Sequence, residues 1–356
     1  MSTKEPLLLT GGLGMVGSAV CRAVVASGRR PVIFDTGHDR SLIRSVEHLC
    51  DFEYGSIENP LHLMAVTQKY KPTTMLHFAG RLGSYVEQFP SIALQTNLIG
   101  TTSIFECARL MGVNRVIFPS TKMIYGHVQQ EYQHPHYKPV PEDHPLNPLI
   151  LYAKLKRATE ELAMHYAKLY DLDIIAMRFG SSFGPGILGR SKAIPLMGLI
   201  ESAIRNEPFQ LECGTEQKDD YCYSGESANA VVSALNVPLK KGSFRAFNIA
   251  SGELISLGQI IEVLQGLYPN WQGRVGPGLD YRKIGMGYYF QMDTSKATSE
   301  LGFKPQFTFK KAVQDRQPFI EHIRATYLCF SSILWVFQNC MQFCIYDVNH
   351  SFHHTL

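Results

Sequence analysis

The chain is poor in the features that mark secreted and nucleic-acid-binding proteins. Charged residues make up only 18% of its 356 residues, and the net charge is +3. Because the lysines and arginines are scattered, no basic stripe would attract nucleic acid, and we expect no nucleic-acid partner. The first six residues lead directly into an apolar run, which leaves no room for a secretion signal and predicts a cytoplasmic protein.

Regular cysteine spacing is also missing. The eight cysteines form no disulfide framework, so we expect reduced thiols, and no metal site is predicted. No internal repeat or low-complexity tract is evident. The sequence instead offers a hydrophobic fraction of 45%, which is enough for one large domain or two interleaved ones.

Short apolar or β-branched runs alternate with helical stretches along the chain. This alternation predicts the α/β class, with a doubly wound parallel sheet. From about residue 179 the pattern becomes irregular and rich in glycine and proline, and one further run then returns to the sheet. The expected strands are 7–10, 31–34, 74–78, 115–119, 173–177 and 246–249.

A glycine-rich motif follows the first of these runs. Thr10–Gly17 reads TGGLGMVG, which allows a tight strand-to-helix turn with a pyrophosphate at the helix N-terminus. Asp35 ends the next apolar run, where a carboxylate can bind the ribose hydroxyls of NAD and repel the additional phosphate of NADP. The alternative is a glycine-rich turn followed by an ordinary loop aspartate. The order of strand, turn, helix, strand and acid favours the NAD site.

A second motif carries chemistry. Tyr152 and Lys156 lie four residues apart in a helical stretch and therefore share one helix face. A nearby ammonium lowers the pKa of a tyrosine, which would make Tyr152 a general acid and base. This spacing alone is common and usually has no function. Upstream, however, Arg115–Pro119 runs into Ser120 and Thr121, at the kind of strand end where open α/β sheets bind ligands.

Together these motifs resemble the extended short-chain dehydrogenase/reductases, in particular the NAD-dependent epimerase/dehydratase family. The resemblance covers about residues 5 to 318 and is specific for the family, though not for a substrate. The matching segments, in family order, are Thr10–Gly17, His77–Gly80, Asn97–Thr101, Ser120–Gly126, Tyr152–Lys156, Arg178–Pro185, Phe247–Gly252 and Asp293–Ala297.

The resemblance implies how the chain is divided and assembled. Residues 1–178, with a returning strand at about 244–251, would form a Rossmann domain that binds NAD. Residues 179–325 would form a smaller C-terminal substrate domain. The helices near 90–111 and 151–170 pair across a two-fold axis in this family, so a homodimer is expected.

The resemblance also assigns roles in the site. Tyr152 would exchange the proton of a substrate hydroxyl, Thr121 would hydrogen-bond the same oxygen, and Lys156 would hold the ribose and lower the tyrosine pKa. Hydride would pass between the substrate carbon and nicotinamide. Thr121 could instead be a strand-end cap, and Ser120 could compete for its role. The expected cofactor contacts are Gly11, Gly14, Met15, Val16, Gly17, Asp35, Ser56, Ala79, Asn97, Tyr152, Lys156 and Phe179.

One departure from the family pattern bears on the reaction. Nucleotide-sugar dehydratases of this family carry Asp-Glu directly after the catalytic threonine, because removing water needs a further acid and base. Lys122 and Met123 occupy these positions here. This argues against dehydration and leaves epimerisation through a transient ketone, or a net oxidation or reduction.

Other departures bear on the substrate. Gly180 stands where an asparagine usually contacts a nucleotide-sugar diphosphate, and Asp219 stands where an arginine clamps phosphate, which a carboxylate would repel. The leading hypothesis is a nucleotide-sugar epimerase, and the alternative is a dehydrogenase of a small sugar acid or polyol. A non-catalytic NAD-sensing protein is a third hypothesis, which the intact triad disfavours. The expected substrate-binding residues are Ser120, Ser181, Lys218, Arg282 and Lys283, the last three as replacements for the arginine.

Two further segments lie outside these motifs. His77 is expected to pack at a strand end, and residues 127–145 are expected to form a solvated polar loop over the site mouth. The apolar tail, 326–356, does not resemble the family. It is long enough for a membrane anchor, but its polar residues disfavour that interpretation, and Cys340, Cys344, His350 and His353 are unlike zinc ligands in their spacing. A packed appendage, a poorly ordered segment and a segment absent from the true gene product stay open.

Overall fold

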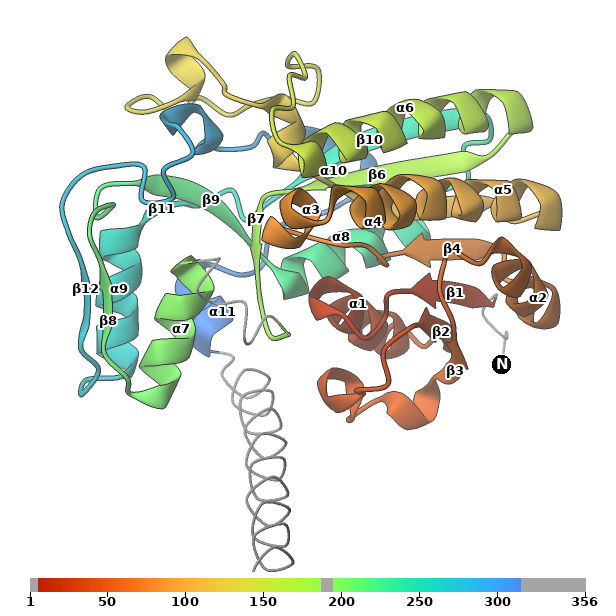
Figure 1. Ribbon diagram of the computed structural model, residues 1–356, viewed down its shortest axis with the longest axis horizontal. Helices are drawn as coiled ribbons and strands as arrows, with labels where there is room; N and C mark the ends of the chain where they lie inside the picture. The colour runs from red at the N-terminus through yellow and green to blue at the C-terminus, as the bar shows by residue number, and fades with distance from the viewer. Residues whose placement is uncertain (1–5, 187–194, 315–356) are drawn as a thin grey trace, which may run out of the picture.

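A seven-stranded parallel sheet forms the larger part of the molecule (Figure 1). The computed structural model describes residues 6–186 and 195–314. The strand order is β10-β6-β5-β4-β1-β2-β3, which is the doubly wound arrangement predicted from the sequence. The strands are β1 Leu7–Thr10, β2 Pro31–Asp35, β3 Asp51–Tyr54, β4 Thr74–His77, β5 Arg115–Thr121, β6 Asp173–Phe179 and β10 Ser243–Ile249.

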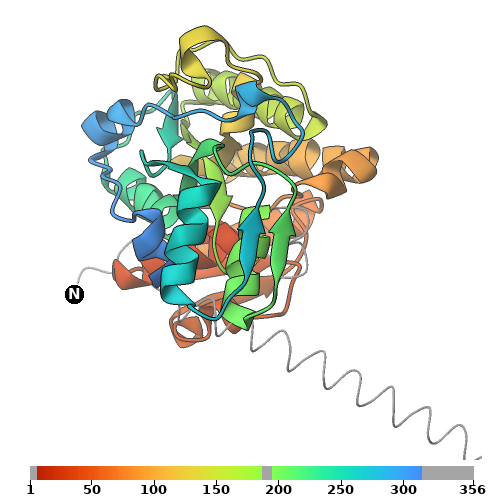
Figure 2. The same cartoon turned by 90° about the vertical axis from the view of Figure 1, so that its left-hand side faces the viewer.

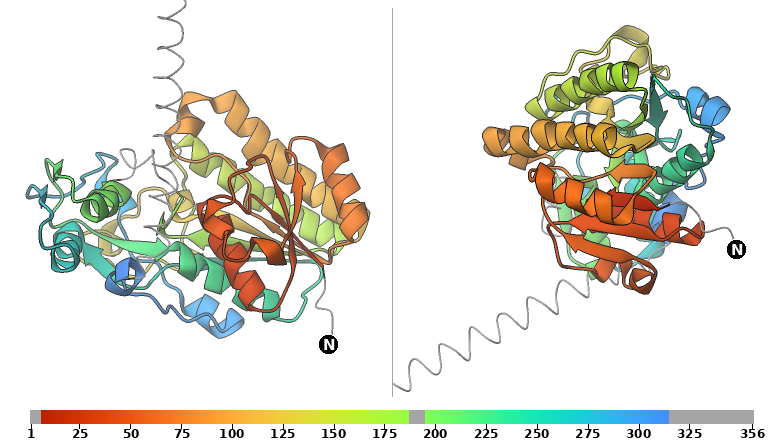
Figure 3. Two further views of the ribbon diagram at one scale, coloured as in Figure 1. Left: turned by 90° about the horizontal axis from the view of Figure 1, so that it is seen from below. Right: turned by 90° about the vertical axis from the view of Figure 1, so that its right-hand side faces the viewer.

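Helices cover both faces of this sheet because its strand residues are apolar on both faces. Leu7 and Leu9 of β1 join a core with α1 and α8, whereas Leu8 points the other way into a core with α2, α5 and α6. Figures 1 and 3 show α5 and α6 side by side along the second face. The helices of this part are α1 Met15–Ala26, α2 Pro60–Tyr70, α3 Ser84–Gln88, α4 Pro90–Leu94, α5 Thr101–Met111, α6 Leu151–Tyr170, α8 Ser224–Asn236 and α10 Ser295–Leu301.

All six predicted strands are confirmed, but the sequence prediction missed β3. This strand reads DFEY and lies at the edge of the sheet, where it pairs only with β2 among the described strands. Each of its residues is half-buried. A search for apolar runs overlooks such a strand, since an edge strand needs no continuous apolar run.

A second, smaller group of elements packs beside the large sheet. It contains a three-stranded sheet in the order β11-β9-β7 and a β12-β8 pair. Figure 2 looks onto this group, with α9 beside β8 and β12. Its own core includes Trp271, Phe183 and Phe309. The elements are β7 Ser181–Phe183, α7 Pro195–Arg205, β8 Phe209–Leu211, β9 Lys218–Tyr223, β11 Leu254–Ser256, α9 Leu257–Leu267, β12 Gly273–Val275 and α11 Phe309–Gln314.

Residues 6–186 and 195–314 contain no helix that is both long and apolar enough to cross a lipid bilayer. The tail 326–356, with Cys340, Cys344, His350 and His353, lies outside the described residues.

Candidate active site

The glycine motif forms the turn between β1 and α1, at the point where the strand order changes direction. Gly11 has φ +69°, and a Cβ there would lie 2.3 Å from the Ala79 nitrogen. A Cβ on Gly17 would lie 2.0 Å from the Gly11 carbonyl oxygen. These two glycines are therefore required by the turn itself.

Gly14 lacks a side chain for a different reason. It is exposed and precedes α1 as its N-cap, and a Cβ there would meet only the Gly11 oxygen, at 3.5 Å. The first turn of α1 has no acidic residue and no side-chain cap. Half-buried Met15 and Val16 begin the helix. Among the described residues, no side chain caps the positive end of this helix, and it fits a pyrophosphate.

Asp35, at the end of β2, supports the same turn. Its Oδ2 accepts a hydrogen bond from the Leu13 amide at 3.0 Å, and its Oδ1 accepts one from the Gly37 amide at 2.9 Å. A carboxylate has about four acceptor sites, so capacity for ribose hydroxyls is left. Close by in sequence, the guanidinium of Arg40 stacks on Phe52 at 3.8 Å.

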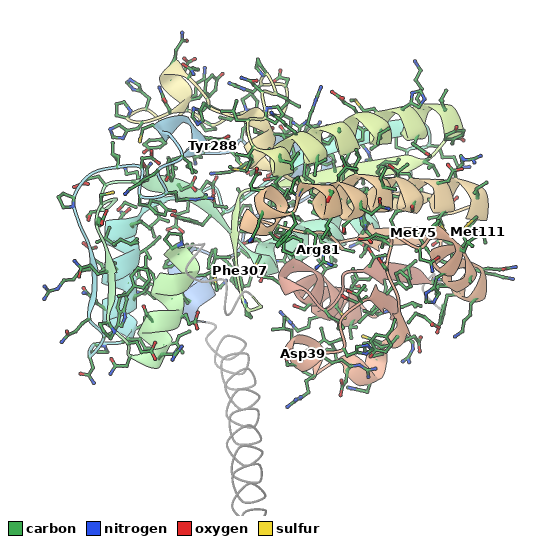
Figure 4. All side chains as sticks on the ribbon, viewed as in Figure 1. Asp39, Met75, Arg81, Met111, Tyr288 and Phe307 are labelled. Carbon is green, nitrogen blue, oxygen red and sulfur yellow. The ribbon has the colours of Figure 1, made fainter. Side chains whose placement is uncertain are left out.

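Three other predicted cofactor contacts lie around the loops that follow β3 and β4. Ser56 Oγ caps a turn by accepting from the Glu58 amide at 3.1 Å. The Asn97 amide bonds both main-chain groups of Arg81, at 2.7 and 2.9 Å, so it holds the loop that contains half-buried Ala79. Arg81 is labelled in Figure 4. Asn97 therefore shapes this loop in addition to any contact with a cofactor.

Phe179 and His77 are buried at the ends of β6 and β4. Phe179, at the end of β6, stacks on Phe78 with ring centroids 6.5 Å apart. His77 is 1% exposed and hydrogen-bonds Thr10 and Thr101 through its two ring nitrogens, at 2.7 and 2.9 Å. Burial lowers the pKa of His77 to about 3. The prediction of a packed strand-end histidine is confirmed.

The predicted triad lies on two elements that pack together, because α6 contacts β5 and the short helical turn η4, Lys122–Tyr125. Lys156 donates a hydrogen bond to the Pro119 carbonyl of β5 at 2.7 Å. Burial lowers the pKa of Lys156 to about 8. The lysine is therefore anchored to the strand that ends in Ser120 and Thr121.

Tyr152 differs from the sequence prediction in one respect. Lys156 was expected to lower the tyrosine pKa, but burial is the dominant influence and raises it. The side chain packs against an apolar cluster that includes Val86 and Leu155. Burial disfavours the charged phenolate relative to the neutral phenol.

Thr121 and Ser120 behave differently at the end of β5. Thr121 Oγ1 accepts a hydrogen bond from the Met123 amide at 3.2 Å, so it is a cap, as the alternative interpretation held. Its hydroxyl proton is still available to donate, because a cap uses only a lone pair. Ser120 Oγ is buried and has no hydrogen-bond partner among the described residues. Both hydroxyls thus keep capacity for another group.

A buried network behind these residues was not foreseen. The Arg178 guanidinium donates to Glu160 of α6 at 2.8 and 3.1 Å and to the Tyr125 hydroxyl at 2.9 Å. Tyr125 in turn donates to Asn248 of β10 at 2.7 Å. Three of the motif segments are therefore hydrogen-bonded to one another. Their residues hold η4 and α6 in place.

The two charged departures from the family pattern meet in space. Lys122 of η4 and Asp219 of β9 form a buried ion pair, at 2% and 1% exposure. Ser181 Oγ donates to the second Asp219 oxygen at 2.6 Å. Lys122 therefore offsets the repulsion of phosphate that the sequence predicts for Asp219. Separation by 97 residues hid this pairing from the sequence.

The glycine at position 180 also has a local explanation. A Cβ on this residue would lie 3.0 Å from the Asp220 carbonyl oxygen and 3.2 Å from Ala250 Cβ. The neighbouring segments of the chain therefore leave little room for the asparagine side chain that the family pattern has at this position.

The three cationic residues predicted to replace the arginine are all exposed. Lys218 begins β9 with its side chain in solvent. Lys283 pairs with Glu212 at 3.5 Å, with 77% and 89% of the two side chains exposed. Arg282 is exposed beside Tyr281, whose pKa burial raises to about 12 while the Arg282 charge opposes this shift. The structure thus brings Ser120, Thr121, Lys122 and Asp219 close to the strand ends, while the three cations are exposed to solvent.

Residues 127–145 are more firmly packed than expected. His134 and His136 are exposed, as predicted for a polar loop. Tyr137, however, is 4% exposed, and the Val140 amide bonds the Gln291 carbonyl at 2.9 Å. The segment also reaches Tyr288, labelled in Figure 4, whose ring lies edge-on to His127. Buried aromatic and apolar side chains anchor it, against the expectation of a solvated loop.

Comparisons with known proteins agree with this geometry. The model of the NAD dependent epimerase/dehydratase family matches residues 7–250. A UDP-glucose 4-epimerase of Rhizobium leguminosarum bv. trifolii is 29% identical over 332 residues, which cover 87% of this chain and 95% of that protein. A dTDP-glucose 4,6-dehydratase of Haemophilus influenzae is 26% identical, with 86% and 95% covered. The crystal structure of a UDP-glucose 4-epimerase from Thermotoga maritima shares the fold, with a TM-score of 0.75 at 22% identity over 90% of this chain and 99% of that one.

Proposed function

Because the chain belongs to the NAD-dependent epimerase/dehydratase family, we propose that it is an epimerase acting on a nucleotide sugar. The observation that carries this proposal is the packing of α6, with Tyr152 and Lys156, against the end of β5, with Ser120 and Thr121. Relatives named UDP-glucose 4-epimerase, 25% to 29% identical over almost their whole length, support a nucleotide sugar.

The triad would move the proton of the substrate. Tyr152 accepts the proton of the reacting hydroxyl as the ketone forms, and it returns that proton when the ketone is reduced. Thr121 donates to the same oxygen with the proton that its cap leaves free. Since burial raises the pKa of Tyr152, its deprotonation depends on the Lys156 cation in the complex. NAD, when bound, takes up and returns the hydride.

The chain's own groups would hold NAD along the carboxyl edge of the sheet. The open N-terminus of α1 binds the pyrophosphate through main-chain groups, and the remaining lone pairs of Asp35 bind the ribose. The full set proposed for the cofactor is Gly11, Gly14, Met15, Val16, Gly17, Asp35, Ser56, Ala79, Asn97, Tyr152, Lys156 and Phe179.

Dehydration fits this site poorly. Lys122 is committed to Asp219 and cannot serve as the further acid beside a keto intermediate. Met123 has no titratable group. The family does include a dehydratase among the relatives of this chain, so product analysis has to include the dehydrated sugar.

One observation favours a second candidate, a dehydrogenase of a small sugar acid or polyol. The buried Lys122–Asp219 pair is neutral overall, and Lys218, Arg282 and Lys283 are exposed. No arginine fork therefore holds a diphosphate at this position, and a substrate without a nucleotide would need none.

We also propose a homodimer through α5 and α6. Large apolar side chains are exposed on these helices and just before α5, including Leu110 and Leu169 at 50% and 55% and Ile99 at 44%. A groove of about 260 Å³ between α2, α5 and α6 adds Pro60 and Met64 to this surface. A second copy would cover this apolar surface. Light scattering at micromolar concentration should give twice the chain mass, and a monomer mass would contradict the proposal.

The decisive experiment is turnover of UDP-glucose by the NAD-loaded protein, with UDP-galactose measured by chromatography. Formation of UDP-galactose without net NADH supports the epimerase. Net NADH from a sugar acid or polyol, with no change in UDP-glucose, supports the dehydrogenase. Turnover of neither, with NAD still bound, would leave the NAD-sensing hypothesis.

A further inference from the structure

Lys122, Asp219 and Ser181 form one polar unit where the large sheet meets the three-stranded sheet. Lys122 follows β5 of the large sheet, while Asp219 and Ser181 belong to β9 and β7 of the smaller one. The ammonium also lies over the ring of Phe290, 4.7 Å from its centroid. Both charged side chains are almost fully buried, so solvent does not reach the ion pair.

The charge of Asp219 fixes the direction of its bond with Ser181. An ionised carboxylate can only accept, and Asp219 lies in an ion pair with Lys122. Ser181 must therefore donate its single hydroxyl proton, over the 2.6 Å contact. The Ser181 oxygen is left with lone pairs only, so toward any other group it acts as an acceptor.

Ser181 lies beside the strand end that carries Thr121. It follows Phe179, whose partner across the β5–β6 pair is Thr121. The residue is half-buried, in contrast to Lys122 and Asp219 at 2% and 1% exposure. Its neighbour Ser182 differs, since its hydroxyl donates to the Gly180 carbonyl at 3.2 Å and is not linked to the ion pair.

We propose that Ser181 determines specificity by accepting a hydrogen bond from a hydroxyl of the sugar. Lys122 and Asp219 are positioning residues that act through it. A phosphate oxygen carries no proton at neutral pH and would meet the Ser181 lone pairs as an unfavourable pair, so this position selects hydroxyl over phosphate. The inference rests on the proposed nucleotide-sugar function, and it assigns the sugar, not the diphosphate, to this place.

The test compares two probes on the NAD-loaded protein, UDP-glucose and UDP, by calorimetry. Ser181→Ala should weaken UDP-glucose about fivefold to tenfold, the effect of one lost hydrogen bond, and leave UDP unchanged. Ser182→Ala is the matched control and should change neither. Ser181→Thr, which keeps the hydroxyl, should restore much of the loss.

The pair itself is tested by removing both charges together, so that no buried charge is left unpaired. Lys122→Met with Asp219→Leu should fold. Because Ser181 can then donate as well as accept, this variant should lose part of the preference for UDP-glucose over UDP. Equal weakening of UDP and UDP-glucose in Ser181→Ala, or no weakening of either, would overturn the inference.

Failure of the proposed function gives a different result. If the unmodified protein binds no UDP-glucose but oxidises a polyol or sugar acid, the nucleotide-sugar function is wrong. The same variants then report through KM for that substrate. A KM rise in Ser181→Ala but not in Ser182→Ala, with kcat nearly constant, supports the hydroxyl contact, and an unchanged KM overturns it.

Discussion

The proposed cofactor side and the proposed substrate side of this site hold their shape by different interactions. On the cofactor side, main-chain geometry dominates. A Cβ added to Gly17 or Gly11 would lie 2.0 or 2.3 Å from main-chain atoms, and the Asp35 carboxylate holds the turn. On the substrate side, side-chain charges dominate, in the buried Lys122–Asp219 pair. Main-chain turns tolerate little change, whereas a charge pair can be exchanged as a unit. The family motif is thus intact on one side and rearranged on the other.

The largest expected effect lies between the two sides, at Tyr152. Tyr152→Phe removes only the hydroxyl, so turnover should fall by about a thousandfold or more while NAD affinity stays nearly unchanged. Steady-state kinetics and NAD titration measure the two quantities. Activity within a few-fold of the unmodified protein would remove Tyr152 from the mechanism.

The next effect tests the main-chain side. Gly17→Ala places a Cβ against the Gly11 carbonyl, so the turn must shift, and NAD binding should weaken at least about tenfold. Gly14→Ala is the control for the turn geometry, because its Cβ meets no close protein atom. It should fold with unchanged stability, and any loss of NAD affinity there would report contact with the cofactor alone.

The charge-pair side should respond differently to single and double changes. Lys122→Met leaves Asp219 buried without its partner, which should lower the free energy of unfolding by about 3–5 kcal/mol. Adding Asp219→Leu should recover most of that loss. Urea unfolding measures both variants, and a single variant as stable as the unmodified protein would show that the pair is not closed to water.

The smallest effect concerns the choice of dinucleotide. Asp35 should disfavour the 2′-phosphate of NADP by charge repulsion, so NAD should bind more tightly. Asp35→Ser should reduce the difference in affinity between NAD and NADP. Arg40, which stacks on Phe52, could then attract the 2′-phosphate without a nearby carboxylate that repels it. Titration of both dinucleotides decides this, and tighter binding of NADP to the unmodified protein would show the assignment to be wrong.

The comparisons with known proteins confirm three predictions: the family, an NAD-dependent enzyme, and NAD as the cofactor. The domain boundaries, the site residues, the homodimer and the cytoplasmic location stay predictions. The sequence could reach this far because the glycine turn and the helical Tyr152–Lys156 spacing are local patterns, each complete within a few residues.

What the sequence by itself determined was the doubly wound sheet, the order of its strands along the chain and the glycine turn after β1. Only the tertiary structure decided that Lys122 and Asp219 neutralise each other, that burial governs the pKa of Tyr152, and that Lys218 and Lys283 lie in solvent. The physical reason is range. Periodicity and turn chemistry act between near neighbours, whereas charge pairing and desolvation depend on which distant segments the fold brings into contact.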